Sequence, residues 1–150
     1  MLRSILLITL VFALANATNV QKCKKGEPFP LSVDIKGCQE EPCDIVRGST
    51  AVMDVHFVSP KDNVKKLTAK ITATALGITT PYELPESEAN VCKNLLNGAS
   101  CPLDEGEDVI YQLNFYIDYI YPKIPVKVEV SLVDEDKESF ACFAVDIKVK

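Results

Sequence analysis

Tryptophan is absent from this chain, and histidine occurs once, as His56. True immunoglobulin domains bury a tryptophan against an inter-sheet disulfide, so the missing residue excludes that family in the strict sense. One histidine and no C-x-x-C pair leave no zinc-site spacing. A serine-histidine-aspartate triad would have to use His56, and no G-x-S-x-G turn lies near it. We therefore expect no metal, no cofactor and no enzymatic activity, with His56 solvated on the polar face of a strand.

Long apolar runs are equally scarce, because only residues 5–14 form one, and they are far fewer than the ~20 residues that span a bilayer. Arg3 precedes this run, and Ala15-Asn16-Ala17 follows it as an A-x-A signal. This plan is typical of a secretory signal peptide, residues 1–17, with cleavage after Ala15 as an alternative. The mature domain, residues 18–150, is then secreted and extracellular. The one N-x-S/T sequon, Asn16-Ala17-Thr18, is cut away or left at the terminus depending on the cleavage site, so glycan-directed delivery to lysosomes is disfavoured.

The composition is that of an ordinary globular domain, with 47% hydrophobic and 25% charged residues in 150. These values exclude a disordered chain and favour one domain. The formal net charge is −5, and losing Arg3 makes it about one unit more negative. An acidic chain of this kind disfavours nucleic acid as a partner.

Six cysteines in a secreted chain predict three disulfides, because the count is even and the compartment is oxidising. Spacing alone leaves 15 connectivities open. Cys38 and Cys43 are near neighbours, as are Cys92 and Cys101, so each pair suits a local bridge. Cys23 and Cys142 would then join the start of the mature chain to its last strand.

Apolar and polar residues alternate with a period of two along most of the chain, which predicts strands with one buried face. No segment shows a helical stripe, and polar turns separate the strands. We therefore predict an all-β, immunoglobulin-like sandwich of two antiparallel sheets with six or seven strands. The predicted strands are residues 31–35, 51–57, 67–75, 109–121, 124–132 and 143–149.

One segment breaks this pattern, the proline-stiffened stretch from Gly77 to Pro85. Pro81 and Pro85 restrict the backbone and lower the cost of holding Tyr82 and Leu84 in place. Two interpretations stay open: a plain rigid loop, or a lip over an apolar interior.

Several motifs together resemble the Niemann–Pick type C2 branch of the MD-2-related lipid-recognition (ML) family, over essentially the whole mature chain. They are the cysteine series, Gly37-Cys38-x-x-x-Pro42-Cys43, the segment 77–85, Cys101-Pro102 and Tyr121-Pro122. The resemblance implies a seven-stranded, two-sheet sandwich with one apolar ligand between the sheets. It also implies the disulfides Cys23–Cys142, Cys38–Cys43 and Cys92–Cys101.

The resemblance singles out three positions at the pocket mouth of sterol-binding members, which fall on Tyr82, Ile117 and Tyr121 here. The alternation independently places Ile117 and Tyr121 on an inward face. Tyr82 stands where the sterol binders carry phenylalanine, and Thr80 where they carry valine, so the mouth gains two hydroxyls. Further candidate lipid-binding residues are Leu84, Met53, Val55, Phe57, Leu113 and Phe115, with Leu67, Ile71, Val126, Val128 and Val130. Periodicity does not distinguish a cavity from a filled core at these positions.

The expected function is therefore that of a monomeric, secreted carrier that holds a sterol, fatty acid, fatty alcohol or other long-chain lipid. A membrane receptor or acceptor is the other expected partner. Arthropod members of the family suggest a semiochemical as one possible cargo. The alternative is an innate-immune module that binds a microbial glycolipid for a receptor, as the MD-2 branch does, and a wide pocket rimmed with Lys or Arg would favour it.

Overall fold

The computed structural model describes residues 17–150, so the predicted signal peptide lies outside the described residues except for Ala17. Within them the chain forms nine strands, one short helix and one 3-10 turn. Their bounds are β1 Gln21–Lys22, β2 Ser32–Ile35, β3 Cys43–Ile45, β4 Thr50–Val58, β5 Thr68–Ala75, β6 Ile78–Tyr82, α1 Glu86–Ala89, η1 Val91–Lys93, β7 Asp108–Tyr116, β8 Pro125–Val133 and β9 Ser139–Val149. No helix of this part of the chain is long and apolar enough to cross a membrane.

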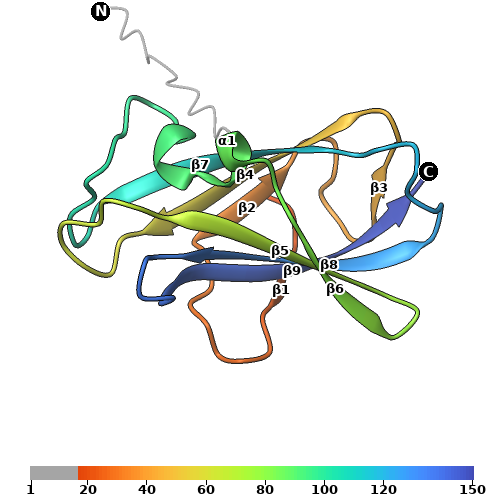
Figure 1. The fold of residues 1–150 in the computed structure, drawn as a ribbon, viewed down its shortest axis with the longest axis horizontal. Helices are drawn as coiled ribbons and strands as arrows, with labels where there is room; N and C mark the ends of the chain where they lie inside the picture. The colour runs from red at the N-terminus through yellow and green to blue at the C-terminus, as the bar shows by residue number, and fades with distance from the viewer. Residues whose placement is uncertain (1–16) are drawn as a thin grey trace, which may run out of the picture.

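The strands form two layers that face each other (Figure 1). One sheet has six strands in the order β1-β9-β8-β5-β6, with β3 added beside β9, and the other has three in the order β2-β4-β7. All pairs are antiparallel except β3 with β9. The predicted fold class, an all-β sandwich of two sheets, is confirmed.

The alternating segments became strands with the expected faces. Along β4, the inward Met53, Val55 and Phe57 are buried, while Asp54 and His56 are more exposed. Their partners Leu113, Tyr111 and Val109 on β7 are buried as well. The hydrophobic core therefore lies between the two sheets, as the period of two requires.

Three features differ from the sequence prediction. β7 ends at Tyr116, and residues 117–121 do not continue it. There Asp118 Oδ1 accepts the N–H of Ile120, 3.0 Å away, which is a turn that an extended strand does not allow. The proline-stiffened segment contains the edge strand β6, whose residues are mostly exposed and so show no alternation. The strands β1 and β3 and the helix α1 are too short to leave a periodic signal.

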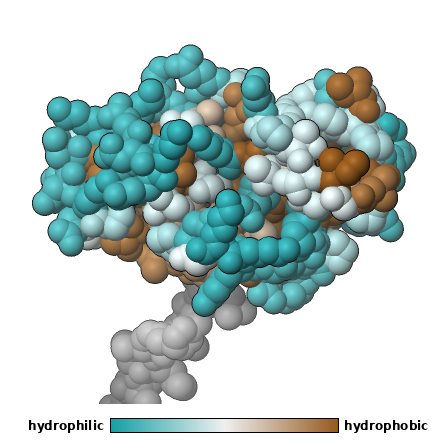
Figure 2. Space-filling view, turned by 60° about the horizontal axis from the view of Figure 1, so that its bottom comes forward, coloured by the Kyte–Doolittle hydropathy of each residue, from teal (hydrophilic) through white to brown (hydrophobic). Residues whose placement is uncertain are grey.

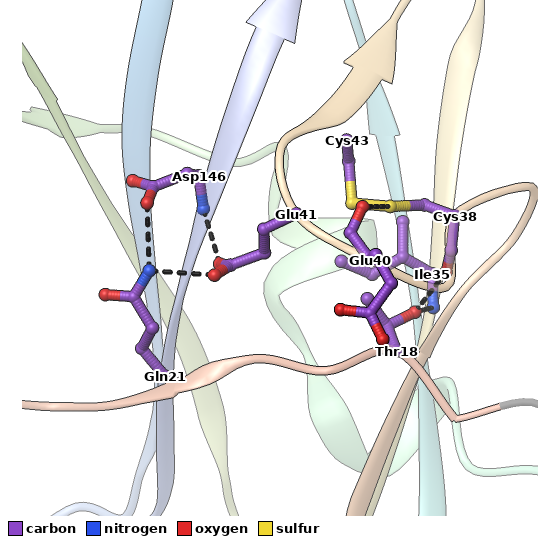
Figure 3. The surroundings of a disulfide bond; sticks show 8 residues. All are labelled: Thr18, Gln21, Ile35, Cys38, Glu40, Glu41, Cys43 and Asp146. Carbon is purple, nitrogen blue, oxygen red and sulfur yellow. Dashed lines mark hydrogen bonds between the residues drawn. A yellow bond between two sulfur atoms is a disulfide. The ribbon is translucent and has the colours of Figure 1, made fainter.

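Three disulfides form in the described residues, with the pairing that the resemblance implies: Cys23–Cys142, Cys38–Cys43 and Cys92–Cys101. Around Cys38–Cys43, side chains tie the N-terminal segment to both sheets (Figure 3). Thr18 Oγ1 donates to the carbonyl of Cys38 and accepts the N–H of Ile35 at 2.8 Å. Glu41 accepts the backbone N–H of Asp146 at 2.7 Å, which fastens the disulfide loop to β9.

Candidate ligand-binding cavity

An apolar cavity of about 300 Å³ lies between the sheets at one end of the sandwich. That end, here called the cavity end, carries the β5–β6 turn, the β7–β8 loop of residues 117–124 and the β3–β4 turn of residues 46–49 (Figure 1). No charged side chain belongs to the lining. The lining residues are Ile71, Ala73, Ala75, Ile78, Thr80, Tyr82, Phe115, Ile117, Tyr121, Pro122, Ile124, Val126, Val128, Ile147 and Val149.

Along β5, burial of the inward residues decreases toward the cavity end. Leu67, which directly precedes the strand, and Ala69 are no more than 4% exposed, and Ile71, at 3%, is the first inward residue that lines the cavity. The next inward residues toward the cavity end, Ala73 and Ala75, are only half-buried and line the cavity. Their methyl groups fill little of the space between the two sheets.

Two tyrosines stand at the mouth. Tyr82, from the edge strand β6, packs edge-on against Phe115 of the opposite sheet, with ring centroids 4.6 Å apart. Its ring centroid lies 6.2 Å from that of Tyr121. Burial, followed by a hydrogen bond in which the Tyr121 hydroxyl donates to the Tyr82 side chain, raises the pKa of the Tyr121 phenol. Tyr121 is therefore a neutral hydrogen-bonding group at physiological pH.

The opposite end, here called the closed end, is filled. There Val64 and Leu103 form an isolated bridge through both of their backbone N–H groups, each at 2.9 Å from the partner carbonyl. Tyr111 is fully buried, and its hydroxyl donates to the carbonyl of Glu88 at 2.6 Å. Residues 86–103, braced by Cys92–Cys101, thereby cover the gap between β5 and β7.

The structure brings together the three residues at the expected mouth, and it places other candidates apart from them. Thr80, Tyr82, Phe115, Ile117 and Tyr121 line the cavity, as do Ile71, Val126 and Val128. The remaining candidates do not belong to the lining. Met53, Val55, Phe57, Leu113, Leu67 and Val130 are buried core residues, and Leu84 is half-buried against that core.

Sequence reasoning did not name several lining residues, among them Ala73, Ala75, Ile124, Ile147 and Val149. All five occupy inward positions of the alternating pattern. That inward position was the usable signal, since side-chain size does not single out Ile124, Ile147 and Val149 and does not separate Ala73 from the buried Ala69. Ile78, the first residue of β6, and Pro122, in the β7–β8 loop, belong to no alternating segment and carried no periodic signal.

Two polar groupings lie outside this lining. On β2, β4 and β7, Ser32 Oγ lies 3.4 Å from His56 Nδ1, and His56 Nε2 pairs with Asp108. They are neighbours across the strands of the three-stranded sheet, on its solvent-facing side, where the alternation places His56. Within residues 17–150, Cys23, Glu27 and Cys142 are close enough to share a metal, yet the two sulfurs are bonded to each other and offer no thiolate.

Large apolar side chains are also exposed around the cavity end. Leu76 and Ile78 of the β5–β6 turn are 87% and 69% exposed, and Ile120 of the β7–β8 loop is 81% exposed. Figure 2 shows brown patches at the right-hand end of this face, the end that carries β5 and β6 in Figure 1. The opening of the cavity is thus surrounded by apolar surface.

Comparisons with known proteins agree with this architecture. The family model described as "ML domain" matches residues 17–149. The NPC intracellular cholesterol transporter 2 of Bos taurus is 28% identical over 138 residues, which cover 92% of this chain and 89% of the bovine protein. The mite group 2 allergen Lep d 2 of Lepidoglyphus destructor is 30% identical, and the match covers 100% of both chains.

A solved structure supports the fold. The Niemann–Pick type C2 protein of the Japanese carpenter ant superposes with a TM-score of 0.75 at 24% identity, covering 88% of this chain and 99% of the ant chain. The family match spans nearly all of the described residues and includes both sheets and the cavity. The chain therefore belongs to the ML-domain family, as a Niemann–Pick type C2-like member, and is a lipid-binding protein rather than an enzyme.

Proposed function

We propose that the protein is a secreted carrier that holds one uncharged lipid with a hydroxyl head, such as a sterol or a long-chain alcohol. The observation that supports this function best is the apolar cavity between the sheets, whose lining has no charged side chain. Its volume of about 300 Å³ lies at the lower end of the range for small-molecule sites, about 300–1,000 Å³. The NPC2-like relatives agree with such a cargo, since the bovine relative is named a cholesterol transporter.

Transfer of apolar surface from water supplies the binding energy. A sterol or C18 chain exposes roughly 400 Å², and burial of that area is worth roughly 10 kcal/mol before ordering costs, at about 25 cal/mol per Å². This scale allows micromolar or tighter binding without covalent chemistry.

The mouth favours an uncharged head. Thr80, Tyr82 and Tyr121 offer hydroxyl groups, which both donate and accept hydrogen bonds. A fatty-acid carboxylate held there would have no cationic partner among the lining residues, and burying an unpaired charge is costly. We therefore rank a sterol or fatty alcohol above an ionised fatty acid.

A microbial glycolipid with several acyl chains fits this cavity poorly. Such a ligand needs a wide pocket, and a basic rim to hold its phosphates. Here the lining contains neither lysine nor arginine. The single-lipid carrier is thus preferred to the innate-immune module.

Release of the lipid needs an apolar acceptor, either a membrane or a receptor. Leu76, Ile78 and Ile120 surround the cavity end and would shield the lipid from water while it moves into that acceptor.

Native mass spectrometry of the secreted protein, followed by lipid extraction, tests the cargo directly. We expect a single bound lipid with a hydroxyl head, and its identity will distinguish a membrane sterol from a semiochemical. A co-purified fatty acid would contradict the uncharged-head proposal. Failure to take up every member of a sterol, fatty-alcohol, fatty-acid and lipid A panel would contradict the carrier itself.

Ala73→Phe tests the location of the site. The phenylalanine ring would occupy the cavity, so we expect the affinity for a fluorescent sterol to fall by at least about a hundredfold. This fall corresponds to the loss of roughly 3 kcal/mol of binding free energy from burial. Thr72→Phe is the matched control, because the neighbouring residue faces the opposite side of β5. Equal uptake by the two variants would move the site elsewhere.

A further inference from the structure

The β7–β8 loop, residues 117–124, forms one wall of the cavity mouth. Ile117, Tyr121, Pro122 and Ile124 all line the cavity. β7 and β8 pair with different sheets, and the loop between them is held at both ends: Ile117 bonds the backbone of the β3–β4 turn, and Val149 N–H donates to the carbonyl of Ile124 at 3.3 Å. Residues 118–123 lie outside the sheet ladders, so another contact must hold the middle of this wall in place.

Arg47, in the β3–β4 turn, supplies that contact. Its Nη1 donates to the carbonyl of Tyr119 at 2.9 Å and to that of Tyr121 at 3.3 Å. The neighbouring backbone adds two bonds: Gly48 N–H donates to the carbonyl of Ile117 at 2.6 Å, and Ile117 N–H donates to the carbonyl of Ser49 at 2.9 Å. Side chain and backbone together fasten the loop from its start to Tyr121.

Gly48 fits this junction because it has no side chain. A Cβ at this position would lie 2.2 Å from the Tyr119 hydroxyl oxygen and 2.3 Å from its Cζ, so the ring of Tyr119 rests on the glycine backbone. The backbone of Gly48 also has a φ of +77°, which favours glycine. A residue with a Cβ would displace the Tyr119 ring and would strain the backbone of the turn.

The turn itself is anchored to the six-stranded sheet. Arg47 N–H donates to the carbonyl of Lys150 at 3.1 Å, and Lys150 N–H donates to the carbonyl of Ile45 at 2.9 Å. The guanidinium thus joins a turn fixed at the end of β9 to the middle of the loop, which has no ladder bond of its own. Its Nε–H is buried without a partner, which lowers the net gain from the fastening and makes it easier to release.

We propose that Arg47 is a positioning residue that latches the β7–β8 loop and so sets how fast the lipid enters and leaves the cavity. The proposal rests on the carrier function above. Arg47 does not line the cavity, so it contributes to loop closure with or without lipid. A group with equal effect on the two states changes the exchange rate and leaves the affinity nearly constant.

Hydrogen exchange of the lipid-free protein tests the latch without any ligand. In Arg47→Met, two charge-assisted bonds are lost, and we expect the amides of residues 117–124 to exchange about tenfold faster. Gly48→Ala should give the same pattern, because alanine disfavours the φ of +77° of the turn that holds Arg47 and also displaces the Tyr119 ring. Lys36→Met is the control, because Lys36 pairs with Asp54 on the solvent-facing side of the three-stranded sheet. Unchanged loop exchange in Arg47→Met would overturn the proposal.

Stopped-flow release of dehydroergosterol tests the consequence. We expect the dissociation rate of Arg47→Met to rise about tenfold while the dissociation constant changes by less than about threefold. Arg47→Lys, which keeps the charge but has a single ammonium, should fall between wild type and Arg47→Met, and it replaces Arg47→Met if that variant does not fold. A raised dissociation constant with an unchanged release rate would contradict the latch. A wild-type protein that binds no lipid would refute the carrier function, while hydrogen exchange would still decide the latch.

Discussion

The two ends of the sandwich are built from the same strands but are packed differently. At the closed end, Ala69 of β5 and its cross-strand neighbour Leu132 of β8 are at most 4% exposed, and residues 86–103 cover them. Toward the cavity end, Ala73 of β5 lies beside Val128 of β8, and the cavity separates both residues from the other sheet. One alternating pattern therefore produces a filled core at one end and a container at the other. Because alanine stands on β5 at both ends, the difference comes from its neighbour on β8, Leu132 or Val128, and from the segment that covers the gap at the closed end.

Truncating a closed-end residue should have the largest effect. Leu67 is fully buried, so Leu67→Ala should lower the free energy of unfolding by about 2–5 kcal/mol. Ile124→Ala at the cavity end should cost much less, because Ile124 is half-buried and already borders empty space. Urea denaturation of the lipid-free variants measures both values. Equal losses would show that the two ends are packed alike.

Removing the Cys92–Cys101 disulfide should weaken the cover of the closed end. The bridge joins residues nine positions apart. The double variant Cys92→Ala/Cys101→Ala should therefore lower the free energy of unfolding by about 2–3 kcal/mol. Uptake of a fluorescent sterol by the folded fraction should stay at the wild-type level, because neither cysteine lines the cavity. Loss of uptake in the folded protein would show that the two ends are coupled.

Replacing an inward alanine of β5 by leucine should affect stability differently at the two ends. Ala69→Leu inserts three carbons into a filled region and should destabilise the protein by about 1–3 kcal/mol. Ala73→Leu, on the same face of β5, extends into the cavity and should leave the free energy of unfolding unchanged or raise it by about 1 kcal/mol. Urea titrations of the two variants provide the measurement, and a larger loss for Ala73→Leu would argue against an open cavity.

Acid should act on the closed end with the smallest effect. Burial alone would raise the pKa of the Asp134 carboxyl, but hydrogen bonds from Lys61 and from the N–H groups of Glu138 and Asp136 hold it below its usual range. Ionised Asp134 therefore stabilises the fold above pH about 3.9, the ordinary value, and this stability is lost as the pH falls through its lower, folded-state pKa.

Thermal unfolding between pH 2 and pH 7 measures this dependence. In Asp134→Asn, the melting temperature should fall less steeply with acid than in wild type. Glu135→Gln, an exposed change in the same turn, is the control and should follow the wild-type curve. If the melting temperature of Asp134→Asn fell with acid as steeply as that of wild type, the Asp134 carboxylate would not be the source of this pH dependence.

The fold was largely predictable from the sequence because a half-buried strand leaves a period of two. For example, the alternation correctly placed Met53, Val55 and Phe57 on the inward face of β4, where they pair with the inward residues of β7. The site was only partly predictable, since Leu113 and Phe115 alternate in the same way although Phe115 alone lines the cavity. Periodicity reports which face is inward but carries no information on the volume opposite that face. The Arg47 contact was not predictable, because its partners are carbonyls more than 70 positions away.

The disulfide between Cys23 and Cys142 has a consequence for the response of the protein to proteolysis. It joins residues 119 positions apart, so almost all of the domain lies inside one covalent ring. A protease that cuts one exposed turn, such as the β5–β6 turn at Leu76, opens that ring without releasing a fragment. The two pieces remain tethered at β9, where the sheet contacts keep them assembled. Nicked molecules should therefore migrate as one species in nonreducing gels and separate only after reduction.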